Sequence, residues 1–133
     1  MIPEFDGRGY LPPGLHRATL EEIEQRFGRQ SELRRIQMES LRWLVDLIKG
    51  SKIKRLIING SFATDEYEPN DVDCVLLIDD DILLDDDSIR TLLDGLPFLD
   101  IQIVNQNRFD YLVEIFFATD RRRTPKGMIE VIL

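Results

Sequence analysis

Two aspartates, Asp71 and Asp73, are separated by one residue where an apolar run begins. Side chains alternate along a strand, so both carboxylates leave the same face while Val72 and Cys74 point the other way. Like charges held this close raise one another's pKa unless a cation neutralises them. Carboxylate oxygens suit Mg²⁺ or Mn²⁺, and Mg²⁺ usually binds one or two carboxylates together with nucleotide phosphates. The pair therefore predicts a metal site that also receives a nucleotide.

A place for those phosphates is predicted at Gly60-Ser61, directly after a short apolar strand at residues 55–59. A glycine after a strand lets the backbone approach a phosphate, and the Ser61 hydroxyl with nearby N–H groups can donate to its oxygens. Residues 62–70 then form a polar connection to the two aspartates. Gly-Ser and Asp-X-Asp are each common, but their ordered combination around two strands is much more specific.

This ordered pattern resembles the DNA polymerase beta superfamily of nucleotidyltransferases, specifically its minimal members, over residues 55–104. Those enzymes transfer a nucleoside monophosphate from a nucleoside triphosphate to a hydroxyl, using two metal ions and three carboxylates. The resemblance implies that Asp71, Asp73 and Asp100 are metal ligands and catalytic residues, and that Gly60 and Ser61 bind the nucleotide. For Asp100, in the predicted strand 99–104, a strand-edge aspartate bound to backbone or water is the other interpretation.

Further motifs stand at residues 11–16, Arg26-Phe27-Gly28, residues 60–64 and 69–73, and Pro125-Lys126-Gly127. With these motifs the chain resembles an uncharacterised family of short, mostly bacterial proteins that are predicted nucleotidyltransferases. Minimal nucleotidyltransferases commonly belong to toxin–antitoxin or defence systems, where they modify a partner protein or an RNA. The resemblance therefore implies a protein or RNA acceptor and a partner toxin. A catalytically silent module of the same fold, acting as an antitoxin-like or regulatory partner, is the alternative hypothesis.

With 133 residues, of which 43% are hydrophobic and 32% charged, the chain is expected to form one domain without disulfides or a structural metal. Residues 1–18, rich in glycine and proline, predict an extended N-terminal arm, and residues 19–133 a single nucleotidyltransferase-like domain. Alternating strands and helices favour an α/β (α+β) fold, with helices packed on a mixed sheet.

Cap residues and apolar spacing predict the individual elements. A capping box of Thr19 and Glu22 begins a helix that ends near Gly28, and Ser31 caps a second helix that ends near Gly50. An acidic, solvated loop from residue 79 leads to a third helix, capped by Ser88. Further elements are expected at residues 72–78 (strand), 99–104 (strand), 110–118 (helix) and 128–133 (strand).

The formal net charge of −8 argues against strong nonspecific binding to DNA or to an anionic membrane. No apolar run approaches the ~20 residues of a membrane span, and the first residues do not read as a secretory signal, so a cytoplasmic location is expected. Cys74 is expected to be buried and inert. Two interpretations of Arg121, Arg122 and Arg123, with Lys126, stay open: contacts to phosphates, or a solvated turn.

Overall fold

The computed structural model describes residues 1–78 and 87–133, and within them a five-stranded mixed sheet is packed with four α-helices. The strands are β1 Gly14–Ala18, β2 Ile53–Asn59, β3 Val72–Ile78, β4 Leu99–Val104 and β5 Gly127–Val131. The helices are α1 Leu20–Phe27, α2 Glu32–Ile48, α3 Asp87–Asp94 and α4 Gln106–Tyr111. This architecture confirms the predicted α+β class.

The strand order is β1-β5-β2-β3-β4. The outer strands pair in parallel, β1 with β5 and β4 with β3, whereas β2 is antiparallel to both of its neighbours. Of the predicted acidic loop, residues 79–87, all but Asp87 lie outside the described part of the chain, as does the side chain of Ser88, and α3 begins at Asp87, one residue before that predicted cap. No helix among the described residues is long and apolar enough to cross a bilayer.

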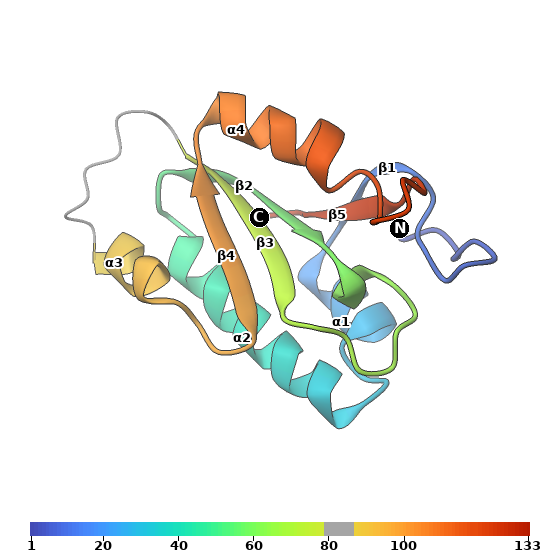
Figure 1. Ribbon diagram of the computed structural model, residues 1–133. Helices are drawn as coiled ribbons and strands as arrows, with labels where there is room; N and C mark the ends of the chain where they lie inside the picture. Colours follow the sequence, from blue (N-terminus) through green and yellow to red (C-terminus); the bar gives the residue numbers. More distant parts are fainter. Residues whose placement is uncertain (79–86) are drawn as a thin grey trace.

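Each face of the sheet has its own hydrophobic core. Neighbours along a strand point to opposite faces, so Ile58 enters one core and Ile57 the other. Helices α1, α2 and α3 cover the face with the larger core, and α4 crosses the opposite face (Figure 1). The smaller core, under α4, contains Ile57, Val75, Leu77, Phe109, Leu112, Val113 and Met128.

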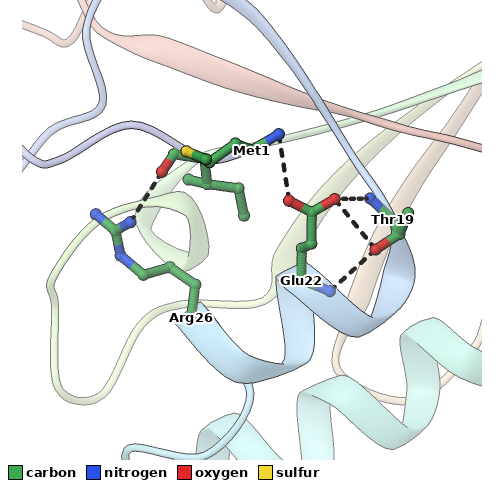
Figure 2. A network of polar contacts seen from close by, with 5 residues as sticks. Met1, Thr19, Glu22 and Arg26 are labelled. Carbon is green, nitrogen blue, oxygen red and sulfur yellow. Dashed lines mark hydrogen bonds and ion pairs between the residues drawn. The ribbon is translucent and has the colours of Figure 1, made fainter.

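Helix α1 begins with the predicted capping box (Figure 2). The Thr19 hydroxyl accepts a hydrogen bond from the Glu22 N–H at 3.2 Å, and the Glu22 carboxylate accepts one from the Thr19 N–H at 3.1 Å. The ammonium of Met1 lies 3.2 Å from the other Glu22 oxygen, and Arg26 donates to the carbonyl of Ile2 at 3.4 Å. These donors attach the first residues to α1, and those from Thr19 and Met1 lower the pKa of Glu22.

The N-terminal segment differs from the expected arm, because its last five residues form β1, paired with β5. Leu11, just before that strand, is fully buried. The sequence concealed β1 because Pro12, Pro13 and Gly14 are typical of turns, and an edge strand needs ladder hydrogen bonds on one side only.

Helix α4 begins at Gln106, four residues before the predicted start at Asp110. The Asn105 side chain caps it by accepting a hydrogen bond from the Arg108 N–H at 3.0 Å. The sequence prediction overlooked this cap because Gln106 and Asn107 continue a polar stretch, with no apolar residue before Phe109.

The predicted end of the same helix has an unusual geometry. From Leu112 to Phe116 the chain forms a π-helical turn, and the N–H of Phe117 donates to the carbonyl of Leu112 at 2.8 Å. Such turns are rare in α-helices and often occur at functional sites. Leu112 is buried in this turn, whereas Phe116 is 56% exposed.

Replacement of Gly127 tests the close packing of β5 on the segment before β1. A Cβ atom here would lie 2.0 Å from the Pro12 carbonyl oxygen and 2.9 Å from the Leu11 Cβ. Gly127→Ala is expected to lower the free energy of unfolding by about 1 to 3 kcal/mol, because the packed backbone must shift. Urea unfolding followed by circular dichroism measures this. Gly7→Ala, with open space around its Cβ, is the control; equal stability of both variants would contradict this packing.

Candidate active site

Three polar side chains form a row across the sheet, on the face that α4 crosses. Asn59, the last residue of β2, is paired with Asp73 in β3, and Asp73 is paired with Asp100 in β4. Val72 and Cys74, on either side of Asp73, belong to the core of the opposite face, as alternation predicted. The register thus brings together two of the three predicted carboxylates, Asp73 and Asp100.

Gly60 follows β2 beside this row. Its φ of 79° lies in the left-handed region that favours glycine. A Cβ atom at Gly60 would lie 2.2 Å from the Oδ2 atom of Asp73, so the missing side chain leaves room for this carboxylate. The sequence predicts a role for this glycine, because a phosphate could approach the backbone here. The structure adds a second reason for a glycine, since a side chain at this position would clash with Asp73.

Ser61 begins a 3₁₀ turn, Ser61–Ala63, and closes the loop that leads to the acidic residues. Its hydroxyl oxygen accepts a hydrogen bond from the N–H of Asn70 at 2.8 Å. A hydroxyl that accepts in this way keeps its own proton for donation. Ser61 can therefore order the loop and still has a proton to donate, which its predicted role as a phosphate ligand requires.

The same loop rests on Arg34 of α2, whose side chain is only 2% exposed. Burial lowers the pKa of this guanidinium, but arginine stays charged at neutral pH. Its five N–H donors suit a set of surrounding carbonyl oxygens. Those acceptors are the carbonyls of Phe27 at 3.1 Å, Phe62 at 2.9 Å, Thr64 at 2.8 Å and Glu66 at 2.9 Å.

Gln37, one turn further along α2, supports the end of the loop. Its side-chain amide donates to the carbonyl of Asn70 at 2.9 Å, and its Oε1 atom has no hydrogen-bond partner in the described structure. Neither Arg34 nor Gln37 was predicted from the sequence. The available signal was their spacing, because these polar residues share the helical stripe of buried Leu41 and Leu44.

Asp73 has the most perturbed carboxyl group of this row. Burial raises its pKa from the ordinary value of 3.8 to about 6, and the charge and hydrogen bonding of Asp100 act in the same direction. Lys126 opposes this shift, and the charge of Asp71 adds a smaller increase. At neutral pH the ionised Asp73 therefore lies in surroundings that favour neutralisation by a proton or a cation.

Two hollows meet at Asp73 and Asn70, which line both of them. The larger hollow has a volume of about 670 Å³, and its other lining residues include Gly60, Ser61, Phe116, Phe117, Arg121 and Lys126. The acidic hollow has a volume of about 580 Å³, and its lining includes Gln37, Asp71, Phe98 and Asp100. The predicted nucleotide-binding pair thus lines one hollow, and the three predicted metal ligands line the other.

Asp71 is exposed and lies one residue before β3. It shares the acidic hollow with Asp73 and Asp100, although its charge affects the pKa of Asp73 less than that of Asp100 does. Among residues 1–78 and 87–133, no group of three or more histidine, cysteine or acidic side chains lies close enough together to hold a metal ion. The structure therefore pairs Asp73 with Asp100 and places Asp71 elsewhere in their hollow.

The donor set nevertheless fits a hard divalent cation, for which carboxylate oxygens are the usual ligands. Two carboxyl groups, those of Asp73 and Asp100, are adjacent, and burial disfavours the charge on one of them. Asn59, opposite Asp73, is fully buried, and neither its Oδ1 nor its Nδ2 atom has a hydrogen-bond partner among the described residues. Perturbed carboxylates and unpartnered buried amides cost stability and are typical of functional sites.

Positive charge reaches the larger hollow from the turn before β5. Lys126 lines this hollow and lowers the pKa of Asp73, and Arg121 lines it as well. Arg122 and Arg123 are exposed on the same turn. The predicted basic cluster is therefore divided, with two of its four members, Arg121 and Lys126, at the candidate site. Cys74 is buried, as predicted, and burial raises the pKa of its thiol.

Together, the fold and the site define an α+β protein with paired carboxylates near the start of two neighbouring parallel strands, β3 and the edge strand β4. Over residues 3–132 the chain matches the family described as "Family of unknown function (DUF6932)", and it belongs to that family. Comparisons with curated proteins and with solved structures gave no significant match. The geometry of the site is therefore the basis for inferring function.

Replacement of Arg34 tests how the loop between Ser61 and Asp71 is supported. Arg34→Met keeps the volume of the side chain but removes the donors to four carbonyl groups. We expect the free energy of unfolding to fall by about 2 to 4 kcal/mol, since buried acceptors lose their partners. Denaturant titration measures this loss. Arg35→Met, an exposed position on α2, should change stability by less than about 0.5 kcal/mol; similar losses in both variants would argue against the support.

The raised pKa of Asp73 predicts a pH-dependent effect on stability. Folded Asp73 binds its proton more tightly than unfolded Asp73, so stability present below pH 3.8 is lost as pH rises through about 6. In chelator-treated buffer, Asp73→Asn should be more stable than the wild type by about 1 to 2 kcal/mol at pH 7.5, and by less than half of that at pH 4.5. Unfolding curves at both pH values test this.

The control for that experiment is Asp46→Asn, at an exposed position on α2. Its stability relative to the wild type should stay within about 0.5 kcal/mol at both pH values. A lower stability of Asp73→Asn at pH 7.5 would show that the carboxylate is stabilising and would contradict the raised pKa of Asp73.

Proposed function

We propose that this protein is a Mg²⁺- or Mn²⁺-dependent nucleotidyltransferase, which transfers a nucleoside monophosphate from a nucleoside triphosphate to a hydroxyl of a protein or RNA acceptor. The observation that carries the proposal is the pairing of Asp73 with Asp100 beside Gly60-Ser61. Two adjacent carboxylates next to a backbone turn that can face phosphates form the arrangement that metal-nucleotide chemistry requires.

Each half of the site has a distinct role in this proposal. Asp73 and Asp100 would hold the cation, which would supply charge neutralisation for the attacking and leaving oxygens, and Asp71 would add negative charge from the same hollow. Ser61 donates its hydroxyl proton to the phosphates. Arg121 and Lys126, which line the larger hollow, supply positive charge to the same anion.

The proposed reaction joins the acceptor to the α-phosphate of the nucleotide. The acceptor oxygen forms a bond to the α-phosphorus and gives its proton to a carboxylate of the acidic hollow, such as Asp100, which passes it to solvent; the bond between the α-phosphorus and the oxygen that bridges to the β-phosphate breaks and releases pyrophosphate. The two hollows suggest a division of space, with the nucleotide in the larger hollow and the acceptor approaching through the acidic one. Asp73 lines both and would lie between donor and acceptor.

We also propose that the protein acts in the cytoplasm, where nucleoside triphosphates and Mg²⁺ are available. There the protein would act within a bacterial toxin–antitoxin or defence system, with a partner toxin as one acceptor. This part is supported by the resemblance to minimal nucleotidyltransferases and not by the geometry of the site.

A second candidate is a catalytically silent binding module of the same fold, acting as an antitoxin-like or regulatory partner. One observation favours it, namely that among the described residues no group of three or more histidine, cysteine or acidic side chains is placed so that it could hold a metal ion. Such a module would bind a nucleotide or a partner protein through the same hollows but would transfer nothing.

A transfer assay tests the proposed activity directly. The purified protein is incubated with each α-labelled nucleoside triphosphate, Mg²⁺ and a cell extract, and the label on protein and RNA is measured. Asp73→Asn and Asp100→Asn should each reduce transfer by more than about 100-fold, since even outer-shell partners of a metal contribute about 10- to 100-fold. Asp71→Asn should also reduce it.

The control variant is Asp46→Asn, which changes the same charge on an exposed part of α2 and should transfer at the wild-type rate. Full activity of Asp73→Asn would refute the assigned site. Nucleotide binding by the wild type, without transfer to any acceptor, would instead support the binding module.

A further inference from the structure

Part of the larger hollow has an aromatic lining. Phe116 and Phe117 come from the end of the π-helical turn, and Tyr10 comes from the N-terminal segment. Lys126 connects this part with the carboxylates, because its charge lowers the pKa of both Asp73 and Asp120. Asp120 in turn accepts a hydrogen bond from the Tyr10 hydroxyl at 2.9 Å. The aromatic residues therefore belong to the same hollow as the proposed phosphate ligands.

Phe116 presents a large apolar surface to this hollow, since it is 56% exposed. Its ring is oriented by two aromatic neighbours. The centroid of Phe117 lies 4.9 Å away at an interplanar angle of 86°, and that of Tyr111 lies 6.4 Å away at 36°. Exposed aromatic surface beside a polar hollow is typical of a binding site, because a flat apolar ligand would remove it from water.

The π-helical turn explains how Phe116 reaches this position. In a regular α-helix, Phe116 would lie on the same face as Leu112, four residues earlier, which is buried. The hydrogen bond from the Phe117 N–H to the Leu112 carbonyl instead spans five residues. The additional residue in the turn shifts Phe117 toward the buried face and leaves Phe116 exposed at the hollow.

We propose that Phe116, with Phe117 and Tyr10 beside it, is the stacking platform for the base of the nucleoside triphosphate. This inference rests on the proposed function, which places the phosphates of that nucleotide at Ser61, Arg121 and Lys126. The volume of about 670 Å³ is in the usual range for a pocket that receives a small ligand.

The hydrogen bonding of Asp120 limits how the base is selected. Its Oδ1 atom accepts from the N–H groups of Arg122 at 2.8 Å and Thr124 at 2.9 Å, and its Oδ2 atom accepts from Tyr10. The carboxylate is thus already occupied with the turn and with Tyr10. Recognition by stacking depends little on the identity of the base, because every base has a π face. ATP and GTP should therefore bind similarly, and both should bind more tightly than pyrimidine nucleotides, which have smaller rings.

Calorimetric binding of ATP, GTP and inorganic tripolyphosphate, each with Mg²⁺, separates the base from the phosphates. The wild type should bind both nucleotides more tightly than tripolyphosphate. Phe116→Ala should weaken ATP and GTP binding by about 5- to 100-fold, the usual contribution of one stacked base, and change tripolyphosphate binding by less than about twofold. Phe116→Trp should retain nucleotide binding, and its retention also shows that the position tolerates replacement.

Ile115→Ala is the matched control, because Ile115 is the preceding residue in the same turn, is 61% exposed and does not line the hollow. It should leave the binding of all three ligands unchanged. Tripolyphosphate binding by the wild type together with unchanged ATP binding by Phe116→Ala would overturn the stacking platform and leave the proposed function standing. Failure of the wild type to bind any of the three ligands would overturn both.

Discussion

The ionised carboxyl group of Asp73, partly buried beside a second carboxyl group, is the constraint on which the rest of the site depends. Gly60 lacks a side chain where Asp73 approaches, and the register of β3 and β4 places Asp100 next to it. This arrangement costs stability, because burial and a neighbouring carboxyl group both disfavour the charge. Folded proteins are stable by a small margin, so such a group is retained where it serves a purpose other than folding.

Two separate hydrophobic cores offset this cost, together with the hydrogen bonds from Arg34 and Gln37 to the loop before Asp71. Helix α2 contributes to both tasks, since one stripe of its surface contains the buried Leu41 and Leu44 as well as Arg34 and Gln37. The backbone that connects Gly60 with Asp71 is therefore held by hydrogen bonds from the buried guanidinium of Arg34 and from the side-chain amide of Gln37. A loop bound in this way can keep its polar groups in place, which lowers the entropy lost when a ligand binds.

Much of the fold could be predicted from the sequence because the relevant signals are local. The capping residues Thr19 and Ser31 act within one helical turn. Alternation along one strand was sufficient to predict that Val72 and Asp73 point to opposite faces of the sheet. The strands at 72–78 and 99–104 were predicted with their observed bounds. Asp100 was assigned to the site only by resemblance, and the register with Asp73 supplies a structural reason for that choice.

The features that could not be predicted depend on partners distant in the sequence. In the sequence, Arg34 looks like a surface residue of a helix, but in the fold the carbonyl groups of the loop surround it. Asn59 looks like an ordinary polar residue at the end of a strand, but the sheet places Asp73 opposite it. The π-helical turn that exposes Phe116 leaves no periodicity that distinguishes it from an ordinary helix end. For Asp71, the spacing to Asp73 predicted two carboxylates on one face, but Asp71 lies one residue before β3, where the alternation of the strand no longer fixes the direction of its side chain.

The pairing of β1 with β5 has a consequence for the order in which this protein folds. The two strands come from opposite ends of the described chain, so their contact closes a very long loop, whereas β2 and β3 join across a short one. Contacts of such high sequence separation form slowly and late. Tyr10 and Lys126 flank these two strands and line the larger hollow. We therefore expect the carboxylate side of the site, on β3 and β4, to form before the wall provided by Tyr10 and Lys126, so that a nascent chain has its acidic residues in place before it has a complete pocket.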